Sequence, residues 1–376
     1  MSFLSHAKHW RDTLGEFFRC AFVSRRYKRK IRRLLAILQK PAAAGVLQKH
    51  EKHQALSRLG QLARGYRDLR WHDAYALANG RWSPGYLPED VFYTLVVPAL
   101  NPFQRTERLR DKNLLALLGF PNLPKVLAHV VRGRLYSPDF RPATWKAVLP
   151  KNLNEEVVVK PARETGGGRG VTFILARDVP DYISKLMEAR GPIDVIVQEC
   201  IRQHEILATI SPSSVNTYRL LTFRVDGEVR LLSAVLRMGV GSSRVDNSAA
   251  GGLACGITSH GELHPFAFDK HFTRYESHPT SQVAFAGMRL PAFEKSVDVA
   301  LDVHRRLLPD LDLVSWDFAI SDQNEPVLIE CNVRYQELNF HQLCNGPIFE
   351  PYFDAIAKRA RGVCLLGLVL PLTRER

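Results

Sequence analysis

The chain lacks the cysteine patterns that mark disulfide frameworks and zinc sites. Its six cysteines occur singly among 376 residues, without a Cys-x-x-Cys pair, as is typical of buried thiols in a reducing compartment. Long apolar runs are also missing, because the longest, residues 363–372, is too short to cross a bilayer. The charged N-terminus has no apolar stretch of the kind found in secretory signals. We therefore expect a cytoplasmic protein without membrane spans.

Acidic residues are scarce in the first 66 residues, which contain 15 Lys and Arg against three Asp and Glu. Most of the formal net charge of +14 therefore lies in this segment. Its apolar residues recur at helical spacing, which predicts basic amphipathic helices. Two interpretations remain open: the apolar stripe docks on the protein's own core, or it binds an anionic membrane surface at the inner membrane face or a protein partner. Nucleic acid is less favoured, because no groove-reading or stacking-aromatic motif accompanies the charge.

The remaining chain is nearly neutral, and its pattern of strand-like and helix-like segments predicts an α+β fold. Apolar β-branched runs predict strands at 156–160, 171–175, 194–200, 204–210, 216–225 and 228–238, interrupted by helices at about 180–190 and 292–308. The sequence DKNLLALLGFP (111–121) predicts a helix that stops at Gly-Phe-Pro. We divide the chain into a basic helical extension (1–66), an N-terminal lobe (67–150), a glycine-loop subdomain (151–205), a metal-binding subdomain (206–350), and a C-terminal helix and tail (351–376).

Residues 313–332 predict a β-hairpin that carries two carboxylates. LVSWDFAI and PVLIEC are strand-like, and SDQNEP between them is turn-forming. A turn centred near Gln323 and Asn324 places Asp317 opposite Glu330, and Asn332 shares the face of Glu330. Facing carboxylates are destabilising unless a cation joins them. Three hard oxygen donors in one small volume suit Mg²⁺, which takes a few carboxylates together with phosphate oxygens and water. The alternative is an exposed sheet face with ordinary polar residues.

A glycine-rich loop between two strands predicts a phosphate site. In EVVVKPARETGGGRGVTFIL, the glycines at 166, 167, 168 and 170 leave backbone N–H groups unshielded, so they can surround phosphate oxygens. Lys160 ends the entering strand, where it can pair with phosphate charge. The loop is neither a Walker A motif nor a dinucleotide fingerprint, because a strand follows it. A flexible hairpin tip is the simpler alternative. Combined with the hairpin carboxylates, however, the loop indicates a site for ATP and Mg²⁺.

These stretches, in this order, resemble the ATP-grasp superfamily over about residues 105–345, which implies two α+β lobes gripping ATP. The resemblance implies that Lys112 and Lys160 are nucleotide-binding lysines, and that TGGGRGV (165–171) covers the triphosphate. VQEC resembles the interdomain linker, so Gln198, Glu199 and Ile201 would contact adenine and Glu205 the ribose. Asp317, Glu330 and Asn332 match the metal signature. The stretches 214–223, 242–257 and 334–349 resemble the sugar-transfer-associated ATP-grasp group, which is linked to glycan and surface-polymer assembly.

The sequence departs from the pattern of this superfamily at two places near the predicted metal-binding residues. Where many relatives carry an Arg two residues before the metal Asp, this chain has Ser315, and Val-Arg-Tyr follows Asn332 instead of a Pro-Gly turn. Neutralisation of the triphosphate must then come from elsewhere. We nominate Arg219, Arg237, Arg244 and Arg334 as candidates, with Arg219 and Arg237 forming surface ion pairs as the alternative. Asn247 with Gly251 and Gly252 could shape the acceptor pocket. We expect His204, His264 and His341 to be surface or capping residues.

The resemblance implies a carboxylate–amine ligase that acts through an acyl phosphate and converts ATP to ADP and phosphate. The expected substrates are small molecules: a carboxylate, such as a sugar acid, amino acid or peptide, and an amine. In this hypothesis Arg237 or Arg244 neutralises the tetrahedral intermediate. The chemistry is mainly positioning and charge neutralisation. One alternative is an ATP-grasp kinase that phosphorylates a sugar or inositol hydroxyl. Another is a non-catalytic scaffold on a membrane-associated complex, which would have no need of the lysines and metal ligands.

Overall fold

The computed structural model describes residues 22–38, 49–163, 168–247 and 251–361. Its largest element is an antiparallel seven-stranded sheet of order β10-β9-β8-β7-β6-β11-β12. The strands come from successive hairpins, because β-branched and aromatic runs alternate with tight turns. The strands are β6 (Thr217–Val225), β7 (Glu228–Met238), β8 (Leu253–Ile257), β9 (Leu263–Phe268), β10 (Arg274–Tyr275), β11 (Leu313–Ile320) and β12 (Pro326–Asn332).

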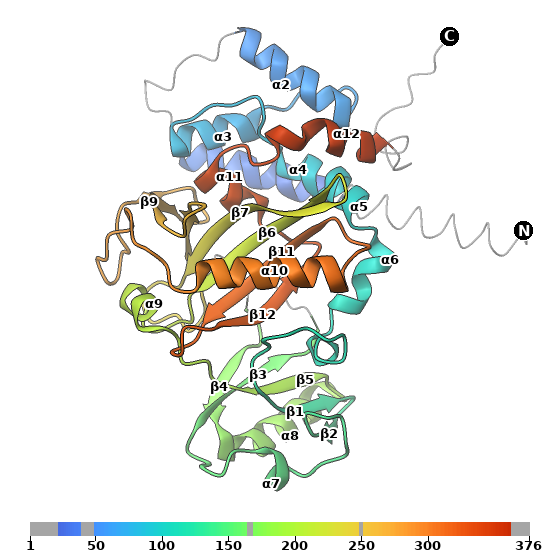
Figure 1. Cartoon of the computed structure of the whole chain (residues 1–376), viewed down its shortest axis with the longest axis vertical. Coiled ribbons are helices and arrows are strands. Elements are labelled where there is room, and N and C mark those ends of the chain that lie inside the picture. Colours follow the sequence, from blue (N-terminus) through green and yellow to red (C-terminus); the bar gives the residue numbers. More distant parts are fainter. Residues whose placement is uncertain (1–21, 39–48, 164–167, 248–250, 362–376) are drawn as a thin grey trace, which may run out of the picture.

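The side chains of β6 show how the two faces of this sheet are used. Tyr218 and Leu220 belong to the core beneath helix α10 (Phe293–Leu307), which crosses the sheet in Figure 1. Leu221 and Phe223 instead pack toward a helical layer on the opposite face. This alternation follows from the two-residue period of a strand. It places Arg219 on the face of the helical layer, with consequences for the site.

The helical layer combines the two ends of the described chain. Apolar residues from both ends share one buried cluster with the large sheet, and Figure 1 shows these helices gathered at one end of the molecule. The layer contains the helical residues 22–37, α2 (Lys49–Leu62), α3 (Arg70–Asn79), α4 (Glu89–Val91), the π-helical turn η1 (Phe92–Val96), α5 (Val97–Leu100), α11 (Leu338–Asn345), η6 (Glu350–Tyr352) and α12 (Phe353–Arg361). None of the helices in the described ranges has the length and apolar character of a membrane span.

A second sheet forms a separate lobe below the large sheet in Figure 1, with strand order β2-β1-β5-β3-β4. Helix α8 (Val179–Arg190) covers it through Val179 and Ile183, which are buried with the strand side chains. The strands are β1 (Val126–Val131), β2 (Arg134–Tyr136), β3 (Glu156–Pro161), β4 (Thr172–Leu175) and β5 (Val195–Glu199). Short helical turns in this lobe are α7 (Trp145–Val148) and η4 (Ala176–Asp178). Because β1 and β2 belong to this sheet, it extends across the predicted boundary at residue 150.

Two sequence-based predictions of local structure were wrong. Residues 204–210 form helix α9 (Glu205–Ile210) instead of a strand, because the His204 side chain accepts the N–H of Ile206 at 3.2 Å and caps the first turn. The segment from residue 112 forms only the 3₁₀ turn η3 (Lys112–Leu114) and further turns. Its backbone turns at Gly119, where φ is +78°. The other connections are α6 (Phe103–Thr106) and η2 (Glu107–Leu109).

The predicted strands at 216–225 and 228–238 are confirmed, as is the turn between them. Asp226 and Gly227 at the tip of the β6–β7 hairpin have φ of +50° and +84°. Two left-handed residues are what a tight hairpin turn needs, and an Asp-Gly pair supplies them at low strain. The helices expected near 180–190 and 292–308 are likewise present as α8 and α10.

The basic helix, defined as residues 22–37, is docked on the protein through its apolar side. Ile31 and Leu34 are 0% and 3% exposed. They belong to a cluster that includes Trp71, Tyr75, Tyr86, Phe340 and Leu343. Docking on the protein's own core, one of the two interpretations of this segment, therefore holds for the described part of it. Apolar positions expected before residue 22 lie outside the described residues.

The substitution Ile31→Ala should lower the free energy of unfolding by about 2–4 kcal/mol, because it leaves a cavity beneath the basic helix. Urea denaturation measures the change. Ile37→Ala is the matched control on the same helix, since Ile37 is 52% exposed and should change stability by less than about 0.5 kcal/mol. Equal effects of the two substitutions would contradict this packing.

Candidate functional site

The β11–β12 hairpin sets the positions of the predicted metal-binding residues. Asp317 pairs directly with Glu330 in the strand register, and Asn332 lies opposite Ser315. The predicted register is therefore confirmed. The Asn332 amide also donates to Asp317 Oδ2 at 3.2 Å. Two facing carboxylates repel each other, and the structure supplies a different cation to each of them.

The cation that faces Asp317 is Arg219 on the neighbouring strand. Asp317 and Arg219 are direct partners in the β11–β6 register. The guanidinium group makes a two-pronged pair, with Nε 2.7 Å from Oδ1 and Nη2 2.6 Å from Oδ2. Both residues are only 5% exposed. A planar guanidinium matches a carboxylate in this way, and the pair is strengthened by its low-dielectric surroundings.

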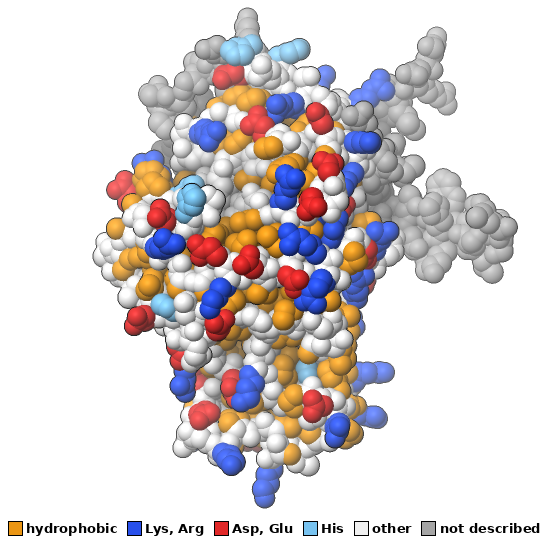
Figure 2. Space-filling model, viewed as in Figure 1, with side chains coloured by type: hydrophobic (Ala, Val, Ile, Leu, Met, Phe, Trp, Pro, Cys, Tyr) orange, Lys and Arg blue, Asp and Glu red, His pale blue; other side chains and the backbone are white. Residues whose placement is uncertain are grey.

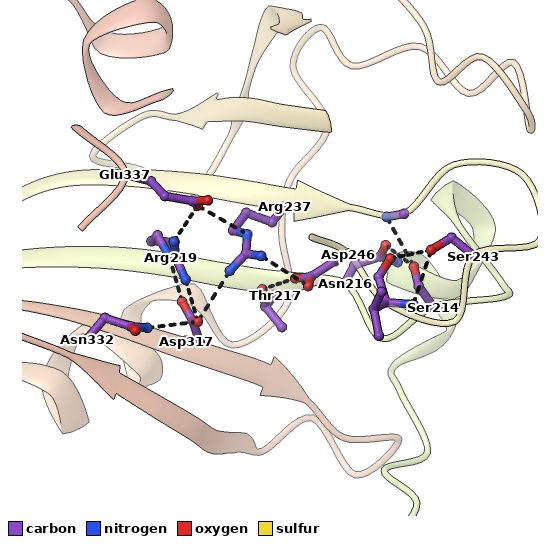
Figure 3. Close-up of polar contacts among 12 residues, drawn as sticks. Ser214, Asn216, Thr217, Arg219, Arg237, Ser243, Asp246, Asp317, Asn332 and Glu337 are labelled. Atoms are coloured by element: carbon purple, nitrogen blue, oxygen red, sulfur yellow. Dashed lines mark hydrogen bonds and ion pairs between the residues drawn. The ribbon is translucent and has the colours of Figure 1, made fainter. Parts of the chain in front are cut away.

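Four further residues extend this pair into a larger network (Figure 3). Arg237 on β7 lies 3.3 Å from Asp317 Oδ2 and 3.4 Å from Asp246 Oδ1. Glu337, at the start of α11, accepts from Arg219 and lies 3.7 Å from Nε of Arg237. Thr217 donates to Asp246. Three carboxyl groups therefore face two guanidinium groups.

The pKa values in this network show which carboxylate is held ionised. Burial alone would raise the pKa of Asp317, but Arg219 and Arg237 outweigh burial and hold that pKa below its ordinary value. Burial raises the pKa of Asp246, although Arg237 and Thr217 oppose that change. Burial would lower the pKa of Arg219, whereas Asp317 and Glu337 raise it. The two arginines thus hold Asp317 ionised.

These residues fit Mg²⁺ in donor type and charge. The described part of the chain contains no group of three His, Cys, Asp or Glu side chains placed to hold a metal ion. Such an ion would therefore depend on Asp317, Glu330 and the amide oxygen of Asn332, completed by phosphate oxygens and water, which is the donor set Mg²⁺ prefers. Arg219, Arg237 and Asn332 together donate four hydrogen bonds to Asp317, about as many as a carboxylate accepts, so a bound Mg²⁺ would have to displace at least one of these donors. The excess of carboxyl groups also favours a cation here.

The two predicted nucleotide-binding lysines meet between the two sheets. Lys112 Nζ lies 2.8 Å from Oε1 of Glu330, and its backbone N–H donates to Ala162 just beyond β3 at 2.8 Å. Lys160 is the second-to-last residue of β3. Burial and the charge of Lys112 together lower the pKa of Lys160 to about 8, although Glu330 acts in the opposite direction. Segments far apart in sequence therefore place two ammonium groups and a carboxylate at the junction of the lobes.

The glycine loop joins β3 and β4 beside these lysines. Gly168 and Gly170 have φ of +67° and +80°, a backbone conformation that favours glycine. A Cβ on Gly170 would lie 2.8 Å from Cγ of Pro161, so only glycine fits there. The predicted phosphate-binding positions Gly166 and Gly167 lie outside the described residues.

Arg244 connects the loop after β7 to this lobe. Its guanidinium pairs with Glu156 on β3, with Nη1 3.0 Å from Oε1, and lies 4.0 Å from the Phe173 ring centroid on β4. The same loop brings Val245 against Gly168, where an added Cβ would lie 3.4 Å from a Val245 methyl. The backbone carbonyl of Asn247 accepts from the Gly252 N–H at 3.1 Å and closes the turn before β8. The predicted acceptor segment therefore rests on the glycine-loop lobe.

The predicted adenine segment begins in the last two residues of the central strand β5 and continues beyond it. Gln198 is buried, with its amide 3.5 Å from the carbonyl of Pro124. The Glu199 backbone N–H donates to the Lys125 carbonyl, and the Glu199 carboxylate lies 2.7 Å from Lys125 Nζ. Ile201 is half-buried in the connection that leads to α9, and Glu205 is exposed at the first residue of that helix.

Several other candidates have structural partners that explain them. Arg334 lies against Phe103 at 3.7 Å, and its Nε donates to Thr106 at 2.6 Å, so it is held by α6. Arg219 and Arg237 do form ion pairs, but these pairs are buried, so the surface alternative was wrong. His204 is a capping residue as expected.

His341 was expected to be a surface or capping residue, and this prediction was wrong. Its side chain is 0% exposed on α11, and Nδ1 lies 2.8 Å from Ser233 Oγ. Burial and then the charge of Arg219 lower the pKa of His341 to about 3, so the imidazole is neutral and cannot balance the carboxyl groups of the network. His264 on β9 is half-buried, and burial lowers its pKa as well.

Sequence analysis did not nominate Asp246 or Glu337. Both lie in stretches noted only for their resemblance to a family, VDN and RYQEL. Glu337 has φ of +54°, which is uncommon for a residue other than glycine and is found at functional sites. Ser315, at the position where an Arg was expected, is buried. The neighbouring strand supplies the positive charge through Arg219.

The family of the chain follows from comparison with known proteins. A family model described as sugar-transfer associated ATP-grasp matches residues 94–358. The chain belongs to this family. The matched region contains the glycine loop, both lysines and the complete β11–β12 hairpin, and its two α+β lobes have the ATP-grasp fold. No curated protein matches the sequence.

Solved structures with a similar fold include ligases and a carboxylase domain. The biotin carboxylase domain of the Hydrogenobacter thermophilus 2-oxoglutarate carboxylase is 12% identical, with a TM-score of 0.40 over 69% of this chain and 47% of that one. D-cycloserine synthetase is 15% identical, with a TM-score of 0.42 over 84% and 97%. The VanG D-Ala:D-Ser ligase of Enterococcus faecalis is 15% identical, with a TM-score of 0.38 over 72% and 63%. The chain spans about half the length of the first of these structures.

Arg219→Met should lower the free energy of unfolding by about 3–5 kcal/mol, because it leaves Asp317 buried without its two-pronged partner. Urea denaturation measures the change. Arg306→Met is the matched control, since Arg306 pairs with Asp302 on the exposed side of α10 and should cost less than about 0.5 kcal/mol.

The loss of stability in Arg219→Met should depend on pH, and the pKa of Asp317 sets the direction of that dependence. The depressed pKa of Asp317 means that its pair stabilises the protein above the ordinary value of 3.8, and that this contribution is lost as the pH falls through the folded-state pKa. The stability difference between the wild type and Arg219→Met should therefore shrink on acidification. A difference that stays constant, or a cost no larger than that of the control, would contradict the buried pair.

Proposed function

We propose that the protein is an ATP- and Mg²⁺-dependent carboxylate–amine ligase. The observation that carries the proposal is the convergence of Lys112, Lys160 and Glu330 at the junction of the lobes, beside an Asp317 that is held ionised. Such a site collects positive charge for phosphates and carboxylates for a divalent cation. Membership of an ATP-grasp family supports the same nucleotide.

Each part of the site has a role in this proposal. Lys112 and Lys160 steady the phosphates, and the glycine loop from Gly166 to Gly170 covers them. The segment from Gln198 through Glu199 to Ile201 borders adenine, and Glu205 reaches the ribose. Asp317, Glu330 and Asn332 would hold Mg²⁺, which would supply positive charge to neutralise the phosphates. The proposed reaction has two steps. The substrate carboxylate attacks the γ-phosphorus of ATP, which forms an acyl phosphate and releases ADP. An amine then attacks the acyl carbon and displaces phosphate.

The structure changes the role proposed for two arginines. Arg219 and Arg237 point into the buried network, so we propose that they orient Asp317 and keep it ionised instead of contacting the reacting groups. Arg244 is the remaining candidate for the developing charge, because it lies in an exposed ion pair with Glu156 that a substrate could displace. Asn247 and Gly251, which follow in the same loop, would border the acceptor.

The description of the family supports a proposal for the substrate class. Because the family is described as sugar-transfer associated, we propose that the ligase joins a sugar acid, amino acid or peptide to an amine during glycan or surface-polymer biosynthesis. We place the reaction in the cytoplasm, where ATP is available. The free thiols of Cys200, Cys255, Cys331 and Cys344 are compatible with that reducing compartment.

The first test is thermal unfolding with and without Mg²⁺·ATP. A ligand that binds only the native state stabilises it by about 2.7 kcal/mol at about 100 times its Kd, which should raise the wild-type Tm by several degrees. Lys160→Ala and Glu330→Ala should lose most of this rise. Lys295→Ala and Glu325→Ala are matched controls, because they break an exposed ion pair of 2.7 Å at the turn of the same hairpin, and they should retain it.

Product analysis then separates the chemistries. With the correct carboxylate, hydroxylamine should trap a hydroxamate while ADP and free phosphate form in equal amounts. Phosphate that remains on the acceptor, without free phosphate, would identify a kinase instead. Absence of any wild-type Tm shift, with and without candidate carboxylates, would contradict nucleotide binding and favour the scaffold.

Nucleotide affinity should fall as the pH rises above about 8. Burial and Lys112 lower the pKa of Lys160 to about 8, so the free protein loses this ammonium charge, and phosphate must restore it by proton uptake. Calorimetry in two buffers of different ionisation enthalpy measures that uptake. Lys160→Arg stays charged and should bind without it. Equal proton uptake by both proteins would contradict this role for Lys160.

A further inference from the structure

The basic helix presents a continuous arginine-rich face to solvent. Its exposed residues recur at intervals of three and four, so they lie along one side of the helix. No Asp or Glu occurs between residues 22 and 37. At about 1.5 Å per residue the face is about 24 Å long. We call it the arginine face; it consists of Phe22, Arg25, Arg26, Arg29, Arg32, Arg33, Ala36 and Ile37.

Lys30, at the edge of the arginine face, has a structural role that the arginines lack. Lys30 Nζ lies 2.6 Å from the buried carboxylate of Glu89 and 5.4 Å from the centroid of Trp71. Within the described ranges, by contrast, no ion pair or hydrogen bond joins a side chain of the five arginines to another residue. Docking of the helix therefore explains Lys30 and the apolar stripe, and it leaves the arginines without a function in the fold.

The ends of the arginine face are apolar and exposed. Phe22 is 69% exposed and Ile37 is 52% exposed. Both are among the most exposed large apolar side chains in the described part of the protein. A basic stripe with an aromatic and an aliphatic residue on the same face matches a helix that lies at a lipid–water interface. Binding to nucleic acid or to an acidic protein would explain the arginines but not the exposed apolar ends.

The two ends of the described chain contribute to one apolar cluster. Val23, at the start of the basic helix, packs against the cluster that contains Phe353, Ile356 and Ala360 of α12. Residues 1–21 precede the basic helix in the sequence, and residues 362–376 follow α12. In sequence, the first segment contains Trp10 and three phenylalanines, and the second contains the longest apolar run of the chain, residues 363–372.

We propose that the arginine face docks this protein on an anionic phospholipid surface. Guanidinium groups pair with lipid phosphates through two donors at once, while Phe22 and Ile37 insert at the level of the headgroups. Each basic residue near such a surface contributes about fivefold in affinity, corresponding to about 1 kcal/mol. The inference is independent of the proposed ligase activity, because it uses a face that contains none of the site residues.

Vesicle sedimentation of the full chain tests the proposal. Phosphatidylcholine vesicles that contain phosphatidylglycerol should bind the protein, and pure phosphatidylcholine vesicles should not. The triple variant Arg25→Ala/Arg29→Ala/Arg32→Ala should bind on the order of 100-fold more weakly. Added salt should weaken binding of the wild type, because exposed charges are screened.

Two matched variants separate charge at this face from charge in general. Arg134→Ala/Lys146→Ala/Lys151→Ala removes three exposed positive charges from the other lobe and should bind like the wild type. Arg25→Lys/Arg29→Lys/Arg32→Lys keeps the charge and should retain most of the binding. Equal binding to neutral vesicles, or equal loss in the Arg134 set, would overturn the proposal. So would single-stranded RNA that displaces the protein from vesicles at stoichiometric amounts, an outcome that assigns the face to nucleic acid.

Discussion

A guanidinium group facing a carboxylate inside the large sheet is the constraint on which the site depends. Arg219 and Asp317 occupy paired positions on adjacent strands, and neither can be exposed to water without unpairing those strands. The pair is stabilising only while both partners remain, since a lone buried charge is costly. Arg237, Glu337 and Asp246 attach β7, α11 and the loop after β7 to this pair. Ion pairs thus join elements that lie far apart in the sequence.

The candidate site lies where the two lobes meet, and each lobe contributes charged side chains that its sheet holds in fixed positions. The large sheet fixes carboxylates through strand register, so Asp317 and Glu330 cannot shift independently. The smaller sheet supplies Lys160 at a strand end and a glycine loop whose backbone can approach a ligand closely. Lys112 comes from a short turn between them and is fixed by a backbone hydrogen bond to Ala162. The two sheets therefore position most of the charged groups, and loops form the surface around these groups.

Local sequence patterns predicted those features that follow from local geometry. Strand alternation and an Asp-Gly turn are enough to define the β6–β7 hairpin, and turn residues are enough to pair Asp317 with Glu330. The partners of Arg219 could not be predicted in the same way, because they depend on the order of strands in the sheet. Asp246 and Glu337 are brought to the network by long-range packing. The strand expected at 204–210 was wrong because a capping histidine favours a helix there, and capping outweighs the β-branched composition of so short a segment.

The Lys112–Glu330 pair gives the junction of the lobes a property of its own. One side chain joins the connection beside β3 to the β12 strand, so at rest the lysine and the carboxylate satisfy each other. Any phosphate that recruits Lys112 must compete with Glu330, and any cation that recruits Glu330 must compete with Lys112. If a nucleotide and a metal ion bind together, the Lys112–Glu330 pair is replaced by a lysine–phosphate pair and a carboxylate–metal pair. If only one of them binds, either Lys112 or Glu330 is left without a partner of opposite charge. Under the proposed function, this resting contact would disfavour binding of either ligand alone and would make the binding of nucleotide and metal ion cooperative.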